Sequence, residues 1–214
     1  MADPIVMIAG LALLALAPFV LMMATSFIKV VVVLNLVRNA LGVQQTPPNM
    51  AINGLALILT FYIMAPAALE TWELFKKNPP PSPLALESAL EMADQLKGPL
   101  QSFLARHADR NSAEFFVRTA QKLWPQKFAE MLDRESLIVL IPAFAITELT
   151  RAFQIGFLLY LPFIVIDLVI SNILLAMGMM MVSPMTISLP FKLLLFVLLD
   201  GWTKLLEGLV LSYT

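Results

Sequence analysis

Four charged residues interrupt the apolar sequence between Leu137 and Leu199 of this 214-residue chain: Glu148, Arg151, Asp167 and Lys192. Acidic and basic side chains in such sequence can relay protons through a membrane protein, or they can fix the register between packed chains. An ionisable group at the bilayer centre costs at least ~2.5 to 3.5 kcal/mol on insertion scales, so each of these residues must face protein or water. Glu148 and Asp167 are nineteen residues apart, and this spacing leaves their relative geometry open.

Signatures of enzymatic chemistry are missing from the sequence. It has no cysteine and one histidine, and it contains no H-E-x-x-H motif, no G-x-S-x-G nucleophile elbow and no glycine-rich phosphate loop. His107 stands near charged neighbours without a second ligand, which is typical of a solvated surface residue. A net charge of −1 gives no electrostatic reason to expect nucleic acid as a partner. We therefore expect no catalysis, no cofactor and no metal.

A sulfur-rich stretch is the second candidate site, and it consists of Met179, Met180 and Met181. Gly178 permits a positive φ, and Pro184 disfavours a helical conformation for the residue before it, so the sequence predicts a bend around the three methionines. Methionine is apolar and deformable, which suits a surface that seals against itself and slides over different partner chains. Our hypothesis is a compliant hydrophobic constriction. With thirteen methionines in the chain, a methionine-rich core is the alternative.

The composition indicates a membrane protein. Hydrophobic residues make up 59% of the chain and charged residues 14%, against about 45–50% and about 25% in soluble domains. Residues 4–28 and 50–69 are each apolar and long enough to cross a hydrocarbon core of about 30 Å. Because the first stretch lacks a positively charged n-region, we expect it to be a retained membrane segment. Lys29 and Arg38 are the basic residues nearest the turn between the two stretches, and they favour a cytoplasmic location for it.

Charged residues are concentrated between Glu70 and Glu135, where ten acidic and nine basic residues lie. We therefore expect three parts: a hydrophobic helical hairpin in 1–69, a soluble helical periplasmic insert in 70–136, and a hydrophobic helical hairpin with the methionine loop in 137–214. Within the insert, Gly98 and Pro99 predict the end of one helix, and Asn111 predicts the start of another. The fold class is predicted to be all-α, with membrane-associated hairpins whose helices are kinked or discontinuous.

Several multi-residue motifs occur in a single order along the chain, and on them it resembles the FliP/SctR family. This family comprises the R subunits of the type III secretion export gate and their flagellar counterparts. The N-terminal hairpin contributes Lys29, Arg38, Asn39, Gly42, Gln44, Gln45, Pro47 and Pro48. The C-terminal part contributes residues 152–156, 166–168, 177–181 and 189–192. The stretch Met181–Ser188 is closer to injectisome members than to flagellar ones.

The resemblance implies a non-enzymatic pore subunit of the bacterial inner membrane. Family members assemble as a homopentamer with S/Q-type and T/R-type subunits into a closed helical cone that projects to the periplasmic side. They work with a switch protein of the U/FlhB type and a V/FlhA-type gate protein, and they pass unfolded secreted proteins through a central pore. By the same resemblance, Met179, Met180 and Met181 form the gasket, and Gly178 and Pro184 are its hinges. Glu148, Asp167 and Lys192, with Arg151, match positions that pair between neighbouring subunits.

Two other functions compete with this reading. The buried charges could relay protons in a secondary transporter, although such folds usually contain internal repeats and we find none. Alternatively, the chain is a purely structural scaffold whose charges set only the register between subunits.

Overall fold

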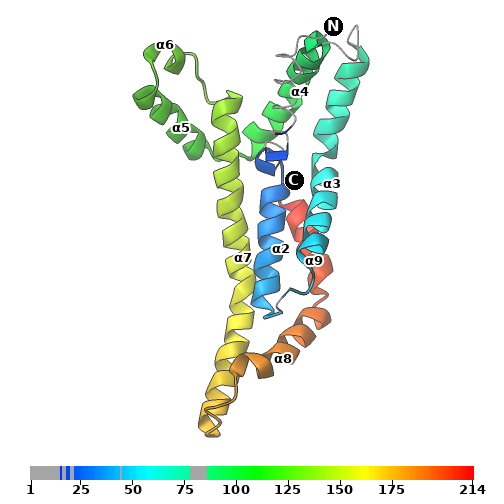
Figure 1. The fold of residues 1–214 in the computed structure, drawn as a ribbon, viewed down its shortest axis with the longest axis vertical. Coiled ribbons are helices and arrows are strands. Elements are labelled where there is room, and N and C mark those ends of the chain that lie inside the picture. The colour runs from blue at the N-terminus through cyan, green and yellow to red at the C-terminus, as the bar shows by residue number, and fades with distance from the viewer. Residues whose placement is uncertain (1–14, 16–17, 20–21, 44, 78–85) are drawn as a thin grey trace. The chain divides into compact units, whose positions relative to one another are not determined.

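The computed structural model describes residues 15, 18–19, 22–43, 45–77 and 86–214, and within these ranges the chain forms helices and no strand (Figure 1). The all-α prediction is confirmed. Most of the first predicted span, 4–28, and also Gln44 lie outside the described residues. The helices are α2 (Phe27–Ala40), α3 (Asn49–Lys77), α4 (Leu86–His107), α5 (Arg110–Leu123), α6 (Gln126–Ala129), α7 (Leu137–Ala176), α8 (Pro184–Leu198) and α9 (Gly201–Leu211).

The chain divides into two compact units, each built from segments that are distant in sequence. Unit 1 comprises the described parts of Met1–Ile28 together with Thr60–Glu148, and unit 2 comprises Lys29–Leu59 and Leu149–Thr214. Helices α3 and α7 each contribute residues to both units. The units therefore follow tertiary contacts, whereas the three predicted parts follow composition along the chain.

Unit 1 has a core at the junction of α4 with the first turns of α7. Leu104, Leu140 and Phe144 are buried together with Ala24, and the ring of Phe103 lies 5.7 Å from that of Phe144. A second buried cluster joins α5 to α7 through three small or branched side chains: Ala113, Val139 and Ala143. These contacts hold the charged insert against the beginning of α7.

Two details of the insert differ from the sequence prediction. Helix α4 runs through Gly98 and Pro99 instead of ending there, because its last turns place Leu100, Phe103 and Leu104 in the core and packing outweighs local helix propensity.

The cap of α5 is Asp109, whose carboxylate accepts a hydrogen bond from the backbone N–H of Ser112 at 3.1 Å. Asn111 therefore lies inside α5 and does not cap it, because the carboxylate two residues earlier accepts the N–H that a capping side chain must satisfy. The helix ends at Trp124, whose backbone N–H donates to the carbonyl of Ala120.

Unit 2 is organised by the apolar face of α2. Val30, Val33 and Leu34 are fully buried, and Gly156 of α7 lies directly against the side chain of Leu36. At the other end of the unit, the rings of Phe196 and Trp202 meet edge to face with centroids 5.3 Å apart, joining α8 to α9. Close approach of α2 and α7 thus depends on a residue without a side chain.

The C-terminal third is discontinuous, with breaks at residues 177–183 and 199–200. The charged residues do not interrupt α7, which is one helix of 40 residues and therefore about 60 Å long. Helices α3 and α7 are long and apolar enough to cross a membrane, and α8 is apolar but shorter. Only 22% and 11% of the most apolar windows of α3 and α7 are buried within this chain. Most of the apolar surface of both helices is therefore exposed on this chain.

Candidate functional site

The methionine loop, residues 177–183, leaves α7 through a well-formed helix stop. Gly178 has a φ of +73°, its N–H donates to the carbonyl of Leu175 at 3.0 Å, and the N–H of Met179 donates to the carbonyl of Leu174 at 2.9 Å. This pair of bonds is a Schellman motif, which a glycine in the left-handed conformation completes at low cost. At the other end Ser183 is extended and Pro184 opens α8.

The three methionines of the loop are exposed to different degrees. The exposed fraction is 41% for Met179 and 81% for Met180, and Met181 is fully exposed. They are therefore not core residues of this chain. In Figure 1 the ribbon leaves α7, turns through this loop and returns as α8. The loop therefore presents an exposed apolar group on a defined bend.

An ion pair ties α8 to α7 beyond the loop. Lys192 Nζ lies 2.6 Å from Asp167 Oδ2 and also donates to the carbonyl oxygen of Ala40 at 3.2 Å. Ser188 donates its hydroxyl to Asp167 Oδ1 at 2.6 Å. The Lys192 side chain is 3% exposed and that of Asp167 is 35% exposed. We call these four groups, namely Asp167, Ser188, Lys192 and the Ala40 carbonyl, the α8 clamp.

The remaining predicted charges occupy distinct positions. Glu148 is fully buried and Arg151 is half-buried on the next turn of α7. Lys29 is fully buried, and its Nζ lies 3.4 Å from the centroid of the Tyr213 ring, which is a cation–π contact. The structure thus gives Asp167 and Lys192 a partner in the same chain, and pairing of the four charges between subunits stays a prediction.

The hairpin motif builds the turn between α2 and α3. Arg38 donates to the carbonyl of Pro47 at 3.2 Å and to Asn49 Oδ1 at 2.6 Å, so that its guanidinium braces the turn. Gly42 and Gln45 both have positive φ, at +76° and +63°. The Pro48 carbonyl accepts the N–H groups of Ala51 and Ile52 and so opens α3, and Asn39 is exposed. These residues shape the backbone.

Three groups that bond to the buried charges were not predicted from the sequence: Ser188, Tyr213 and the carbonyl of Ala40. Ser188 precedes Lys192 by four residues, so the two side chains share one helical face, and a serine and a lysine together in an apolar helix were the available signal. Tyr213 and Ala40 carried no such signal, because their partners are far away in the sequence.

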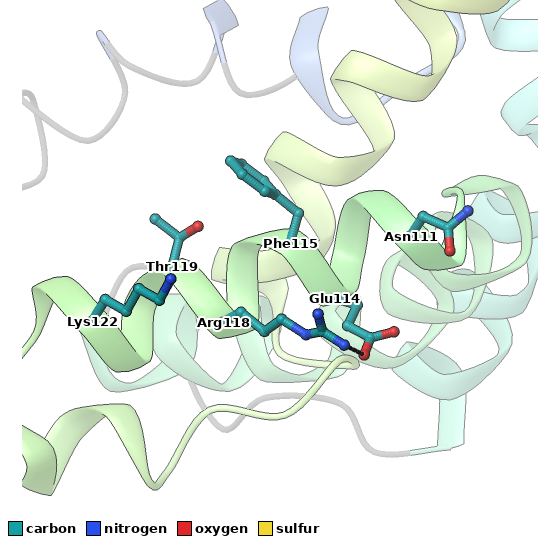
Figure 2. Close-up of a pocket in the computed structure, with 6 residues that line it drawn as sticks. All are labelled: Asn111, Glu114, Phe115, Arg118, Thr119 and Lys122. Atoms are coloured by element: carbon teal, nitrogen blue, oxygen red, sulfur yellow. Dashed lines mark hydrogen bonds and ion pairs between the residues drawn. The ribbon is translucent and has the colours of Figure 1, made fainter.

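The insert has a shallow surface hollow of about 330 Å³ on α5 (Figure 2). Arg118 reaches back to Glu114 at 2.6 Å, and Phe115 points away from that pair. Exposed ion pairs of this kind contribute little to stability or binding. In the described part of the chain, no cluster of three histidine or acidic side chains is placed to hold a metal ion.

Comparison with known proteins assigns the family. The FliP family profile matches residues 10–209. The chain belongs to the FliP family. It is 58% identical over 211 residues to the Yop proteins translocation protein R of Yersinia pestis, covering 99% of this chain and 97% of that protein. It is 49% identical over 201 residues to the hypersensitivity response secretion protein HrcR of Ralstonia nicotianae, with 94% and 93% covered.

A third relative of this FliP-family chain is the virulence protein YscR of Salmonella typhimurium, which is 46% identical over 216 residues, with 99% and 98% covered. The predicted family of type III secretion R subunits, on the injectisome branch, is therefore confirmed. By name, the first of these FliP-family relatives is a translocation protein, the second a secretion protein and the third a virulence protein. The motifs at both ends of the chain indicated the family correctly.

Proposed function

We propose that this chain is the R-type core subunit of a type III secretion export gate. Copies of it, with S/Q-type and T/R-type subunits, form the inner-membrane pore for unfolded secreted proteins, next to the U/FlhB-type and V/FlhA-type proteins. The observation that carries the proposal is the methionine loop: an apolar tip that its own chain exposes and holds on a defined bend. A monomeric membrane protein has no reason to present thioethers in this way.

The loop has the chemistry of a gasket. Burying a methionine side chain is worth about 1.5–3 kcal/mol, so loops that meet around a shared axis close the pore by removing these side chains from water. Methionine has three rotatable side-chain bonds and no branch, so the same loops can repack around a passing chain. Gly178 and Pro184 fix the ends of the loop, and the three methionines between them supply the seal.

The apolar face of α7 supports burial against neighbouring subunits. Phe153, Phe157, Leu161, Val165 and Leu168 recur at spacings of three and four residues, and all are exposed in this chain. Such a stripe packs against another helix. Because α7 is about twice as long as the ~30 Å hydrocarbon core, lipid alone does not account for its apolar surface. We infer that other subunits cover much of α7 in the cone.

In the proposed assembly, the four charges pair at contacts between subunits, and each of the three parts of the chain has a defined location. Asp167 keeps about a third of its side chain exposed while it holds Lys192, so a neighbouring subunit can also reach its carboxylate. We expect Arg151, which is half-buried, to meet a partner at the same interfaces, whereas Glu148 is fully buried and would pair with a neighbour only after its own chain repacks. The α2–α3 turn faces the cytoplasm, the insert of residues 70–136 lies on the periplasmic side, and the two hydrophobic hairpins form the cone wall.

The methionine seal can be tested directly. Replacing Met179, Met180 and Met181 together by Ala should leave the assembled particle intact and make the membrane permeable to small ions, because alanine cannot fill the constriction. The control is Met131→Ala, since Met131 is an exposed methionine of the insert and not part of the loop. Particle assembly is checked by native mass, and permeability by ion conductance in planar bilayers. Unchanged conductance in an assembled triple variant would refute the gasket.

A further inference from the structure

Helix α8 is attached to its own chain in an unusual way. Of its fifteen residues only Ser188 and Lys192 are buried, and both are polar. Its large apolar side chains are exposed instead, and they include Met185, Phe191, Leu194, Val197 and Leu198. A helix in a protein normally docks through its apolar face. Here several large apolar side chains remain exposed, and the bonds from Ser188 and Lys192, together with the contact between Phe196 and Phe163 of α7, attach the helix to its own chain.

The loop end next to α8 has no anchor of its own. Ser183 makes no side-chain capping bond to α8, whereas the α7 end is closed by the two backbone bonds at Gly178. The first side chain that ties α8 to α7 is Ser188, whose hydroxyl donates to Asp167 and also lies 3.2 Å from the carbonyl of Met185. It therefore joins the first turn of α8 to α7.

We propose that Ser188 is a positioning residue for the methionine loop, acting through Asp167. The two bonds to Asp167, from Ser188 and Lys192, fix two successive turns of α8 on α7 and so close the hairpin that contains the loop. A single bond would let α8 rotate about the bonded residue, whereas two bonds one helical turn apart fix the direction of the α8 axis. Without the Ser188 hydroxyl, α8 can turn about Lys192, and Met179–Met181 lose their fixed place.

The clamp also connects the loop to the α2–α3 turn. Lys192 donates to the Ala40 carbonyl, one of the last carbonyls of α2 that lack a partner within the helix. An added Cβ on Gly42 would lie 4.0 Å from Lys192 Nζ and 3.9 Å from Met185 Cγ. A shift of this turn therefore moves the ammonium that holds α8. The expected effect of Ser188 on the pore rests on the proposed gasket function, whereas its expected effect on the position of the loop does not.

The chain has no cysteine, so spin labels can be placed without a background. We would label Met181→Cys in the loop and Leu158→Cys on α7, both exposed, in complexes diluted with unlabelled chain, and measure the distance between labels by pulsed electron paramagnetic resonance. The variant is Ser188→Ala. The control is Ser183→Ala, which removes an exposed hydroxyl beside the loop that caps nothing. Ser188→Thr retains the hydroxyl and is the rescue variant.

We expect a narrow distance distribution for the parent, Ser183→Ala and Ser188→Thr, and a broadened or shifted one for Ser188→Ala. Ion conductance is measured on undiluted, unlabelled complexes of the same serine variants, in which Met181 is retained. If the distribution broadens but conductance stays unchanged, the positioning role stands and the gasket function fails. An unchanged distribution in Ser188→Ala overturns the positioning role. The positioning role is also overturned if Ser188→Ala fails to accumulate while Ser183→Ala and Ser188→Thr do accumulate, because the hydroxyl would then be needed for folding in general.

Discussion

The contact between α2 and α7 allows a prediction from two glycines that respond oppositely to the same substitution. A Cβ built on Gly156 would lie 3.1 Å from Cβ and 3.2 Å from Cγ of Leu36. Leu36 Cδ1 is nearer still, but a rotamer change can move it away, whereas Cβ is fixed to the α2 backbone. Gly156→Ala therefore forces the two helices apart, and overpacking of this kind costs about 1–3 kcal/mol.

Gly208 provides the matched comparison. It lies inside α9, and a Cβ there would meet nothing within 4 Å. Gly208→Ala should stabilise the protein by about 0.5–1 kcal/mol, because alanine loses less backbone entropy in a helix than glycine does. The two variants thus change the same atoms, and their free energies of unfolding should differ by about 2–4 kcal/mol.

The assay is titration of the detergent-purified chain with sodium dodecyl sulfate, followed by far-ultraviolet circular dichroism. The midpoint should fall for Gly156→Ala and rise for Gly208→Ala. In a double-mutant cycle, Leu36→Ala should relieve Gly156→Ala, giving a favourable coupling of about 0.5–3 kcal/mol. A midpoint for Gly156→Ala at or above that of the parent would show that α2 and α7 do not pack closely at this residue.

Three further outcomes are expected. Lys192→Met should destabilise the chain by about 2–4 kcal/mol, which is less than the loss for a fully buried ion pair because the Asp167 carboxylate still reaches water. Adding Asp167→Leu should recover most of this loss in the same titration. Tyr213→Leu should reduce stability by about 1–2 kcal/mol more than Tyr213→Phe does, since the aromatic ring faces the buried lysine ammonium. Equal losses in the two variants would contradict a cation–π contact. The Ser136 hydroxyl, which donates to Asp133, holds the pKa of that carboxyl below its ordinary value of 3.8. The stability that this bond contributes is therefore present above pH 3.8 and is lost as the pH falls through the lowered pKa. Ser136→Ala should move the Asp133 carboxyl titration, measured by NMR, up toward 3.8. An unchanged titration would show that the Ser136 hydroxyl does not lower this pKa.

The gross plan of the protein could be read from local pattern. The apolar stretch 50–69 indicated α3, and glycine followed by proline indicated the break at residues 177–183. The charged residues were expected to divide the region that α7 spans as one helix of 40 residues. Gly178 was predicted to permit a positive φ, and its φ is +73°. These features depend on a few consecutive residues, so the local sequence contains the information that they need.

Local rules failed where packing or a competing side chain prevailed. Gly98 and Pro99 should end a helix, yet burial of Leu104 a turn later keeps α4 continuous. Asn111 and Asp109 are both capping residues, and only the structure shows which carboxylate or amide meets the free N–H groups of α5. Local propensities here differ by less than the free energy gained in the core.

By itself the sequence determined the helical fold class, the two stretches of apolar composition that could cross a membrane and the family. Only the tertiary structure decided how the charged residues pair: Lys192 with Asp167 and the Ala40 carbonyl, and Lys29 with Tyr213. The physical reason is the distance along the chain between the residues that interact. A helix or a turn is formed by neighbours in the chain, whereas the bond from Lys192 to Ala40 joins residues 152 positions apart, and such contacts exist only after the helices have packed.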